Sequence, residues 1–441
     1  MGLFGNPCSE ASFVFGIEDL FHLKSGKDIV VIGTVKGTVR PGCEANVINP
    51  GDDEQSVTKI RIKRLEINNR PVSEASDTLV AIMTEAPADL NLRIGSVFFS
   101  ESSSDDDIYS CYVGALGHSF GAVRRFSIEP ENLEKMSIGD LAETWIHARY
   151  AMDAADDMTD ETRDVIYSRL GSIAQKLISG ILSAKEIFYV YNARTDEAHM
   201  FSQTRLRDDE YECLPPHILL IPKSHALRLS KQFEQDDFEI RSVENGEDGK
   251  GIYNFLGNAF YLNGAAGISV LSTLILIDAS FVVRKPSYEG VPKASIPVTN
   301  PDLVRWLLLM GQMSEPFTDD ADLIHELYYG CFLDELPKAR LLIPIKGGLG
   351  EEEADEEGNV MLQEGQALTL PIMPGYDGKE AVAMFTDWQK LRKQFDMSWS
   401  GMVETVGGII ERYDCAINAT KFVAAGCYVD SDAYDAALDR Q

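Results

Sequence analysis

This sequence has few positive charges for its length. Its 441 residues include 40 Lys and Arg against 70 Asp and Glu, so the formal net charge is minus 30. A field of that sign repels the phosphates of nucleic acids and the anionic surfaces of membranes. Non-specific binding of the whole chain to either is therefore disfavoured, and any such contact needs a local basic surface.

Common motifs of metal and nucleotide binding are also missing. The seven cysteines form no C-x-x-C pair, and their odd number does not indicate a disulfide framework, so a reducing cytoplasm fits best. No G-x-x-x-x-G-K-[S/T] phosphate loop occurs. We therefore expect no metal site and no cofactor.

The sequence lacks an export signal and a convincing membrane span. MGLFGNPC has neither the basic nor the apolar region of a secretory signal, and Asn6 breaks the myristoylation pattern. The uncharged segment Gly251–Ile277 is long enough to cross a bilayer. Its asparagines and the turn signal at Gly264–Gly267 instead predict two buried strands joined by a short loop. We expect a cytoplasmic protein without membrane contact.

Residues 1–100 carry the pattern of a small antiparallel β-barrel. From Ser12 to Phe99, short runs of alternating apolar and polar residues are separated by glycine turns. Within one run, Lys59, Arg61 and Lys63 point to one side of a strand and the intervening isoleucines to the other. This basic face is either a solvated strand surface or a small site for anions or RNA.

The same region resembles domain 2 of elongation factor Tu and related translational GTPases. The resemblance rests on FVFGIEDLFHLKSGKDIVVIGTVKGTVRPGCEANV, VTKIRIKRLEI and ADLNLRIGSVF, which follow the strand order of that family and cover about a fifth of the chain. It implies a β-barrel, but GTP hydrolysis is not carried over because the phosphate loop is missing. It also implies an alternative role as an accessory factor of translation that contacts tRNA, the ribosome or a GTPase.

A serine-hydrolase motif follows the barrel. Gly117, Ser119 and Gly121 have the G-x-S-x-G spacing that presents a nucleophile between a buried strand and a long helix. Here an antiparallel barrel and the polar stretch Ser102–Asp107 precede the serine, and an arginine pair and a proline follow it. We interpret residues 101–137 as a linker with Ser119 in an exposed turn, and we keep a serine hydrolase as an unfavoured alternative.

The rest of the chain predicts two α/β units with the same order of elements, at 138–299 and 300–441. Each begins with two helices and continues with strands, a further helix and more strands; in the second, Asn300 caps a helix that has Pro301 at its first position. Ser224–Phe233 aligns with Thr386–Phe395, where Thr386 and Gln389 form a predicted capping box. These matches predict an internal duplication.

The second predicted α/β unit, residues 300–441, resembles the SseB (enhanced serine sensitivity) family of bacterial proteins. RLLIPI, AVAMFTDWQKLRKQF and CAINA carry the resemblance, which is good over roughly Leu336–Asp430 and degraded over Lys185–Asp278. It implies an α/β fold and supplies no catalytic residues. Trp388 is interpreted as a structural plug or a ligand-stacking aromatic, and Asp387 as a favourable charge at a helix start.

We therefore expect a multidomain protein in which an antiparallel barrel precedes two similar SseB-like α/β domains. The expected function is that of a non-catalytic, cytoplasmic binding or regulatory protein that acts through protein–protein contacts of these domains. Its partner is an unidentified protein, with RNA or the ribosome as an alternative through the barrel. The acidic run Glu351–Glu357 is either a solvated loop or a dock for a basic partner, and the acidic run Thr318–Asp322 is read as a helix start, not a calcium site.

Overall fold

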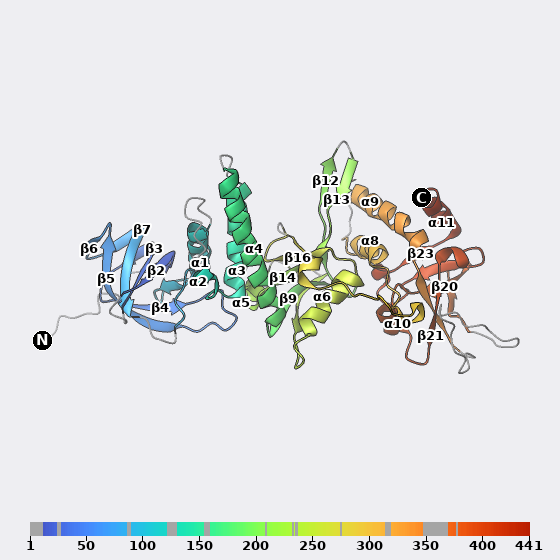
Figure 1. Cartoon of the computed structure of the whole chain (residues 1–441), viewed down its shortest axis with the longest axis horizontal. Helices are drawn as coiled ribbons and strands as arrows, with labels where there is room; N and C mark the ends of the chain where they lie inside the picture. The colour runs from blue at the N-terminus through green and yellow to red at the C-terminus, as the bar shows by residue number, and fades with distance from the viewer. Residues whose placement is uncertain are drawn as a thin grey trace. The chain divides into compact units, whose positions relative to one another are not determined.

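The chain divides into two compact units (Figure 1). A computed structural model describes residues 12–23, 28–85, 90–120, 130–153, 159–207, 210–231, 233, 237–273, 276–313, 319–346, 369–375 and 378–441. The first unit comprises Met1–Phe188, Ile221–Leu229 and Val270–Ile275, and the second comprises Tyr189–Leu220, Ser230–Ser269 and Leu276–Gln441. The boundaries expected from the sequence, after residues 100, 137 and 299, stay predictions.

The first unit begins with a closed antiparallel β-barrel, as predicted. Its six strands run in the order β1-β8-β4-β5-β7-β3, and β3 pairs with β1 to close the ring. Two short strands, β2 and β6, pair with β3 and β5 outside the ring. The strands are β1 (Phe13–Gly16), β2 (Asp19–His22), β3 (Asp28–Val39), β4 (Glu44–Ile48), β5 (Thr58–Ile67), β6 (Arg70–Val72), β7 (Ala75–Glu85) and β8 (Val97–Phe99).

Every second residue of the long strands points into the barrel, and these side chains form its core. In β3, Ile29, Val31, Gly33 and Val35 are buried, while Val30, Ile32 and Thr34 between them are less covered. The same period of two buries Ile60 and Ile62 in β5, because successive side chains of a strand point to opposite faces. This periodicity explains why the barrel could be recognised in the sequence.

A helix, and not a linker, follows the barrel. Helix α1 (Asp105–Phe120) begins with three aspartates, whose charges favour a helix N-terminus, and the Ser104 hydroxyl accepts a hydrogen bond from the Asp107 amide at 3.2 Å. Its apolar face packs closely on the barrel, since a Cβ atom on Gly16 would lie 2.7 Å from the Cys111 carbonyl oxygen. The second half of the polar stretch that predicted a loop, Asp105–Asp107, is therefore the first turn of this helix.

The next helices are α2 (Pro130–Leu133), α3 (Ile138–Asp153) and α4 (Asp160–Ser183). A buried ion-pair cluster joins α1 and the barrel loops to α3. Arg93 is almost fully buried, and its Nε donates to Asp140 Oδ2 at 2.5 Å. The Arg93 NH2 group donates to Asp52 Oδ1 at 2.5 Å, and the Tyr112 hydroxyl donates to Asp140 Oδ1 at 3.0 Å. The predicted helices α3 and α4 are confirmed.

The first α/β sheet follows the order β10-β9-β14-β16-β17, with β11 paired to β14 and β15 to β9. Its elements are β9 (Glu186–Asn192), β10 (Glu197–Ala198), β11 (Met200–Phe201), β14 (His217–Ile221), α5 (Lys223–Ser230), β15 (Phe238–Glu244), α6 (Gly251–Tyr261), β16 (Gly267–Val270), β17 (Ile277–Asp278) and α7 (Ala279–Val282). A separate hairpin joins β12 (Thr204–Arg207) and β13 (Glu210–Cys213).

The prediction of two strands at Gly251–Ile277 is wrong for its first half. Residues Gly251–Tyr261 form helix α6, in which Ile252, Leu256 and Phe260 share a buried face at a spacing of four residues. Only the second half is extended, as β16 and β17. No helix among the described residues is long and apolar enough to cross a bilayer.

The C-terminal α/β region contains a pair β18-β21 and a sheet β19-β20-β22-β23, linked by a bridge between Leu342 and Phe385. Strands β20 and β22 are parallel. The elements are α8 (Pro301–Gly311), α9 (Asp319–Glu335), β18 (Leu341–Ile345), β19 (Ile372–Pro374), β20 (Glu380–Met384), α10 (Trp388–Gln394), β21 (Ser400–Glu404), β22 (Asp414–Ile417), β23 (Cys427–Val429) and α11 (Ser431–Leu438). The fold is thus a barrel followed by mixed α/β regions.

Two predicted helix caps differ in detail. Asn300 precedes α8 as predicted, but its side chain makes no capping bond. Its amide group instead donates to the carbonyl oxygens of Arg340 and Thr386, both at 2.8 Å. Helix α10 is capped by Asp387, whose carboxylate accepts from the Lys390 amide at 2.9 Å, and not by Thr386.

Candidate functional site

The basic face of strand β5 is exposed but largely neutralised. Lys59 donates to Glu101 Oε1 at 2.9 Å, and Lys63 donates to Asp28 Oδ1 at 2.7 Å and to Glu85. The carboxylates raise the pKa of both lysines through these hydrogen bonds.

Arg61 is the remaining member of this face. It has no ion-pair partner among the residues that the structure describes, and Glu44 lies directly opposite it on β4. The alternation predicted for KIRIKR is confirmed, but the face carries little net positive charge. A solvated strand surface accounts for it better than an anion site.

An apolar row lies on the outside of the barrel, on β2, β3 and β7. Phe21 is paired with Val30, and Val30 with Met83, so their side chains lie side by side on one face. Ile32 occupies the same face of β3, and Leu79 the same face of β7. Phe21 and Leu79 are 51% and 50% exposed. We call Phe21, Val30, Ile32, Leu79 and Met83 the outer row.

The G-x-S-x-G motif forms no nucleophile elbow at Gly117 and Ser119. Both residues lie inside α1, with no strand directly before the serine. The Ser119 hydroxyl donates to the Glu18 carbonyl oxygen at 2.5 Å, and His118 Nδ1 lies 3.3 Å from Glu18 Oε1. The hydroxyl therefore satisfies a backbone acceptor of the barrel. Gly121 lies outside the described residues.

The turn Phe385–Trp388, the most specific part of the SseB resemblance, is held by buried hydrogen bonds. Thr386 donates to Asn418 Oδ1 from its amide at 3.0 Å and from its hydroxyl at 3.1 Å. Asn418 has a left-handed backbone with φ 52 at the end of β22, and its Nδ2 atom is buried without a hydrogen-bond partner among the described residues. Thr386, Asp387 and Asn418 are all buried, so they shape the turn and do not face solvent.

Trp388 packs between α10 and β21. A Cβ atom on Gly401 would lie 2.7 Å from the indole ring, so a glycine is required for this close approach. The Arg392 guanidinium lies over the same ring, 5.0 Å from its centre. These contacts favour the interpretation as a structural plug.

A buried charge cluster lies next to this helix within the second unit. Lys390 donates to Glu197 Oε1 and lies 3.3 Å from Asn263 Oδ1, while Asn263 Nδ2 donates to Glu197 Oε2 at 2.7 Å. Lys393 donates to Glu197 at 3.0 Å and to Asp196 at 2.9 Å. Burial alone would raise the pKa of Glu197, but the two lysines outweigh it and hold that pKa below its usual value.

The cysteine thiols of the described residues are poor nucleophiles. Burial raises the pKa of Cys111 to about 11 and the pKa of Cys213, Cys415 and Cys427 to about 12. The odd number of cysteines predicted no disulfide framework, but Cys43 is disulfide-bonded. The free thiols within the described ranges are Cys111, Cys213, Cys331, Cys415 and Cys427.

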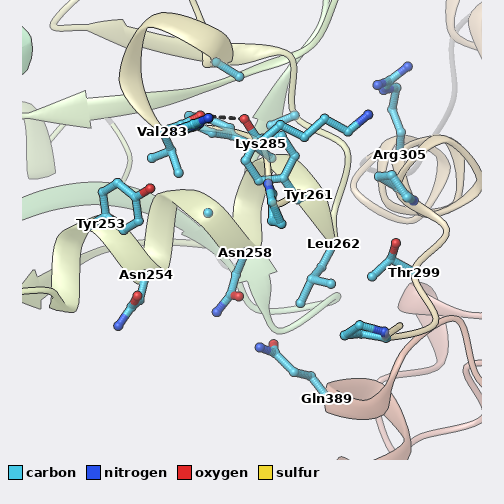
Figure 2. A pocket seen from close by; sticks show the side chains of 18 of the residues that line it. Tyr253, Asn254, Asn258, Tyr261, Leu262, Val283, Lys285, Thr299, Arg305 and Gln389 are labelled. Atoms are coloured by element: carbon cyan, nitrogen blue, oxygen red, sulfur yellow. Dashed lines mark hydrogen bonds between the residues drawn. The ribbon is translucent and has the colours of Figure 1, made fainter. Parts of the chain in front are cut away.

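An open pocket of about 1060 Å³ lies in the second unit, a volume that matches small-molecule sites (Figure 2). One wall is α6, which contributes Tyr253, Asn254, Asn258 and Tyr261. The chain after α7, the start of α8 and Gln389 of α10 supply the other walls. The Tyr261 hydroxyl donates to the Val283 carbonyl oxygen at 2.5 Å and so fixes the chain after α7 against α6.

The lining of this pocket is basic, whereas the whole chain is acidic. Arg284, Lys285 and Arg305 line it together with a single acid, Asp302. Arg305 donates to the Gly264 carbonyl oxygen at 2.6 Å and lies 3.1 Å from Asp302. Arg284 and Lys285 are exposed and have no ion-pair partner in the described part of the chain.

Sequence reasoning did not find this pocket, because its residues come from segments far apart in the chain and belong to no motif. The only signal was the absence of charge over α6, which was interpreted as strands. Some predicted features cannot be compared with the structure: Glu351–Glu357, Thr318 and the arginine pair after Ser119 lie outside the described residues.

Residues 327–404 match the family model of the SseB protein N-terminal domain. The predicted resemblance is thereby confirmed for this part of the chain. The weaker resemblance over Lys185–Asp278 stays a prediction. No curated protein sequence matches the chain.

Two solved structures of translation elongation factor SelB from Methanococcus maripaludis are similar to a part of this chain. One is the complex with the GTP analogue GppNHp and the other is the apo form. In both comparisons the identity is 21% and the TM-score 0.19. The similarity covers 21% of this chain and 20% of theirs, so it spans about a fifth of the length of either protein.

Proposed function

We propose that this protein is a non-catalytic, cytoplasmic bacterial binding protein that docks a partner protein on the outer row of its barrel. The observation that carries the proposal is the run of apolar side chains across β2, β3 and β7, with Phe21 and Leu79 half exposed. Contiguous apolar surface on a soluble domain marks contact sites for other proteins.

The charges around the barrel favour a protein over a nucleic acid as the partner. Lys59 and Lys63 are engaged by carboxylates, so few cations remain to neutralise phosphates. A net charge of minus 30 opposes nucleic-acid binding further. An apolar contact surface needs no such neutralisation and is desolvated by a partner of similar character.

We also infer that the two α/β regions arose by duplication, which would give the protein two related modules. Support comes from the strand order, since β15-β9-β14-β16-β17 corresponds to β21-β18-β20-β22-β23 when the Leu342–Phe385 bridge is included. A left-handed residue follows the matching strands in both regions, Leu271 with φ 60 after β16 and Asn418 with φ 52 after β22. Leucine rarely adopts that conformation, so the coincidence favours common descent.

The docking proposal is tested by replacing the exposed members of the outer row. A double variant, Phe21→Asp and Leu79→Asp, places two charges on this surface without changing the barrel core. The variant and the wild type are purified by affinity tag from native bacterial lysate, and bound proteins are quantified by mass spectrometry. We expect one or a few proteins to co-purify with the wild type and to be lost from the double variant.

The matched control is Val57→Asp, because Val57 is 57% exposed and lies outside the outer row. It should retain the partner. Equal recovery by the wild type and the double variant refutes docking at the outer row. A wild type that recovers only itself refutes the proposed function as a whole.

The accessory role in translation is the alternative, and the same preparations test it. Co-sedimentation with ribosomes in moderate salt, lost when Lys59, Arg61 and Lys63 are all replaced by Glu, would favour that role. Sedimentation that these replacements leave unchanged would show that the basic face is only surface.

A further inference from the structure

The pocket of the second unit offers both polar and apolar groups to a ligand. Its apolar lining includes Phe260, Leu262, Ala265 and Val283. Tyr253, which is 39% exposed, adds an open aromatic ring at one side. A ligand that fits both must carry a flat or apolar body as well as polar groups.

The basic groups of the pocket define the charge of that ligand. Arg305 forms an ion pair with Asp302 and donates to the Gly264 carbonyl oxygen. The charge of the one acid in the lining is therefore neutralised by Arg305. Arg284 and Lys285 then add two positive charges without a described counter-ion. In Figure 2, the side chain of Lys285 extends toward the side of the pocket on which Arg305 lies. The chain has 70 carboxylate side chains, yet none of those described pairs with Arg284 or Lys285. The two cations are therefore available to bind an anionic ligand.

Open amide groups add hydrogen-bonding capacity. Figure 2 shows Asn254, Asn258 and Gln389 on the side of the pocket away from Arg305. Their side chains have no hydrogen-bond partner among the described residues, and each amide offers both a donor and an acceptor. Such groups fix the orientation of a polar ring or a sugar.

Helix α6 leaves room for the ligand at one position. Tyr253, Gly257 and Tyr261 are four residues apart and share one face of the helix. A Cβ atom on Gly257 would have Val283 as its nearest neighbour, at 3.7 Å. A larger side chain would therefore extend into the pocket and fill it without removing any charge.

We propose that this pocket binds a small aromatic anion, with its phosphate or carboxylate at Arg284 and Lys285 and its ring between Tyr253 and the amide side chains. This is a site for a small molecule, distinct from the protein-docking surface of the barrel, and it stands independently of that function. Opposite charges and an aromatic wall together select ligands that have both an anionic group and a ring.

The test is isothermal titration calorimetry of the full chain with a matched set of probes. AMP carries the phosphate and the ring, adenosine lacks the phosphate, and ribose 5-phosphate lacks the ring. Indole-3-acetate represents a carboxylate on a ring. We expect AMP or indole-3-acetate to bind in the micromolar to millimolar range and more tightly than adenosine and ribose 5-phosphate, with affinity that falls as salt is raised.

Three variants locate the binding. The double variant Arg284→Gln and Lys285→Gln should weaken binding of the better probe at least about tenfold, as expected for loss of charge-assisted hydrogen bonds. Gly257→Leu should abolish binding while circular dichroism shows a folded protein. Lys293→Gln, an exposed cation on the same segment outside the pocket, should leave the affinity unchanged.

Two results overturn the proposal. One is the failure of both AMP and indole-3-acetate to bind better than adenosine and ribose 5-phosphate at millimolar concentrations. The other is binding that the Arg284 and Lys285 replacements leave unchanged. A hexaglutamate peptide serves as the last probe, and its binding in place of both aromatic anions would assign the pocket to acidic peptides and refute the small-molecule site.

Discussion

Glu197 and Lys390 form a buried ion pair, and we expect loss of the carboxylate to cost more unfolding free energy than loss of the ammonium. Lys390 has only 5% of its side chain exposed, and Glu197 has 16%. In Glu197→Gln, the Lys390 ammonium can still donate to amide oxygens, at position 197 and at Asn263 Oδ1 at 3.3 Å, but it loses its carboxylate counter-ion. A buried charge left without its counter-ion costs about 3–5 kcal/mol of unfolding free energy.

Lys390→Met should cost less, about 1–2 kcal/mol, because the remaining charge stays compensated. Glu197 still accepts from Lys393 at 3.0 Å and from Asn263 at 2.7 Å in that variant. The double variant removes both charges, so we expect it to be more stable than Glu197→Gln alone, with a coupling of about 1–3 kcal/mol.

The assay is urea unfolding followed by tryptophan fluorescence and circular dichroism. Three of the four tryptophans, Trp306, Trp388 and Trp399, belong to the second unit and report on it. The control is Lys338→Met, which removes an exposed ion pair with Glu335 and should change stability by less than about 1 kcal/mol. The reasoning fails if Lys390→Met costs as much as Glu197→Gln, or if the two effects simply add.

Two further predictions concern packing and pH. Gly311→Ala should destabilise the second unit by about 2 kcal/mol or more in the same urea assay, because the new Cβ atom would lie 1.7 Å from the Ala424 carbonyl oxygen. Gly171→Ala in α4, with nothing within 4 Å, should instead be neutral or stabilise by up to about 1 kcal/mol, and equal losses would contradict the steric argument. Burial lowers the pKa of His199 to about 4, so the neutral ring favours the folded state, and stability should be full above about pH 6.5 and fall by about 3 kcal/mol as the pH drops to 4. His199→Phe should flatten this part of the stability curve, and an unchanged slope would show that other groups cause it.

The barrel and most of the α/β elements could be predicted because their signals are local. A period of two along β3 and β5 buries one face of each strand whatever the neighbouring strands are. The Pro301 start of α8 and the acidic start of α9 are equally local. Strand β21 was missed because Ser400–Glu404 is extended only through its pairing with β18, which the local sequence does not encode.

Two helices were misjudged for different reasons. In α1 the aspartates at 105–107 by themselves favour a solvated loop, although the apolar residues Ile108, Cys111, Tyr112, Ala115 and Leu116 recur at helical spacing just beyond them. In α6 the asparagines and glycines weakened the helical pattern, and packing of Ile252, Leu256 and Phe260 overrides these weak propensities. The pocket brings together residues from distant parts of the chain, and its single local signal is the absence of charge over α6.

Closure of the barrel has a consequence for synthesis of the chain. Strand β8 is the last of the ring, and it pairs with β1 on one side and β4 on the other. A nascent chain that has not yet emerged through Phe99 therefore leaves the free edges of β1 and β4 open to pairing with other chains. The barrel can complete itself only after its final three residues leave the ribosome, so this interval is the one in which protection by a chaperone matters most.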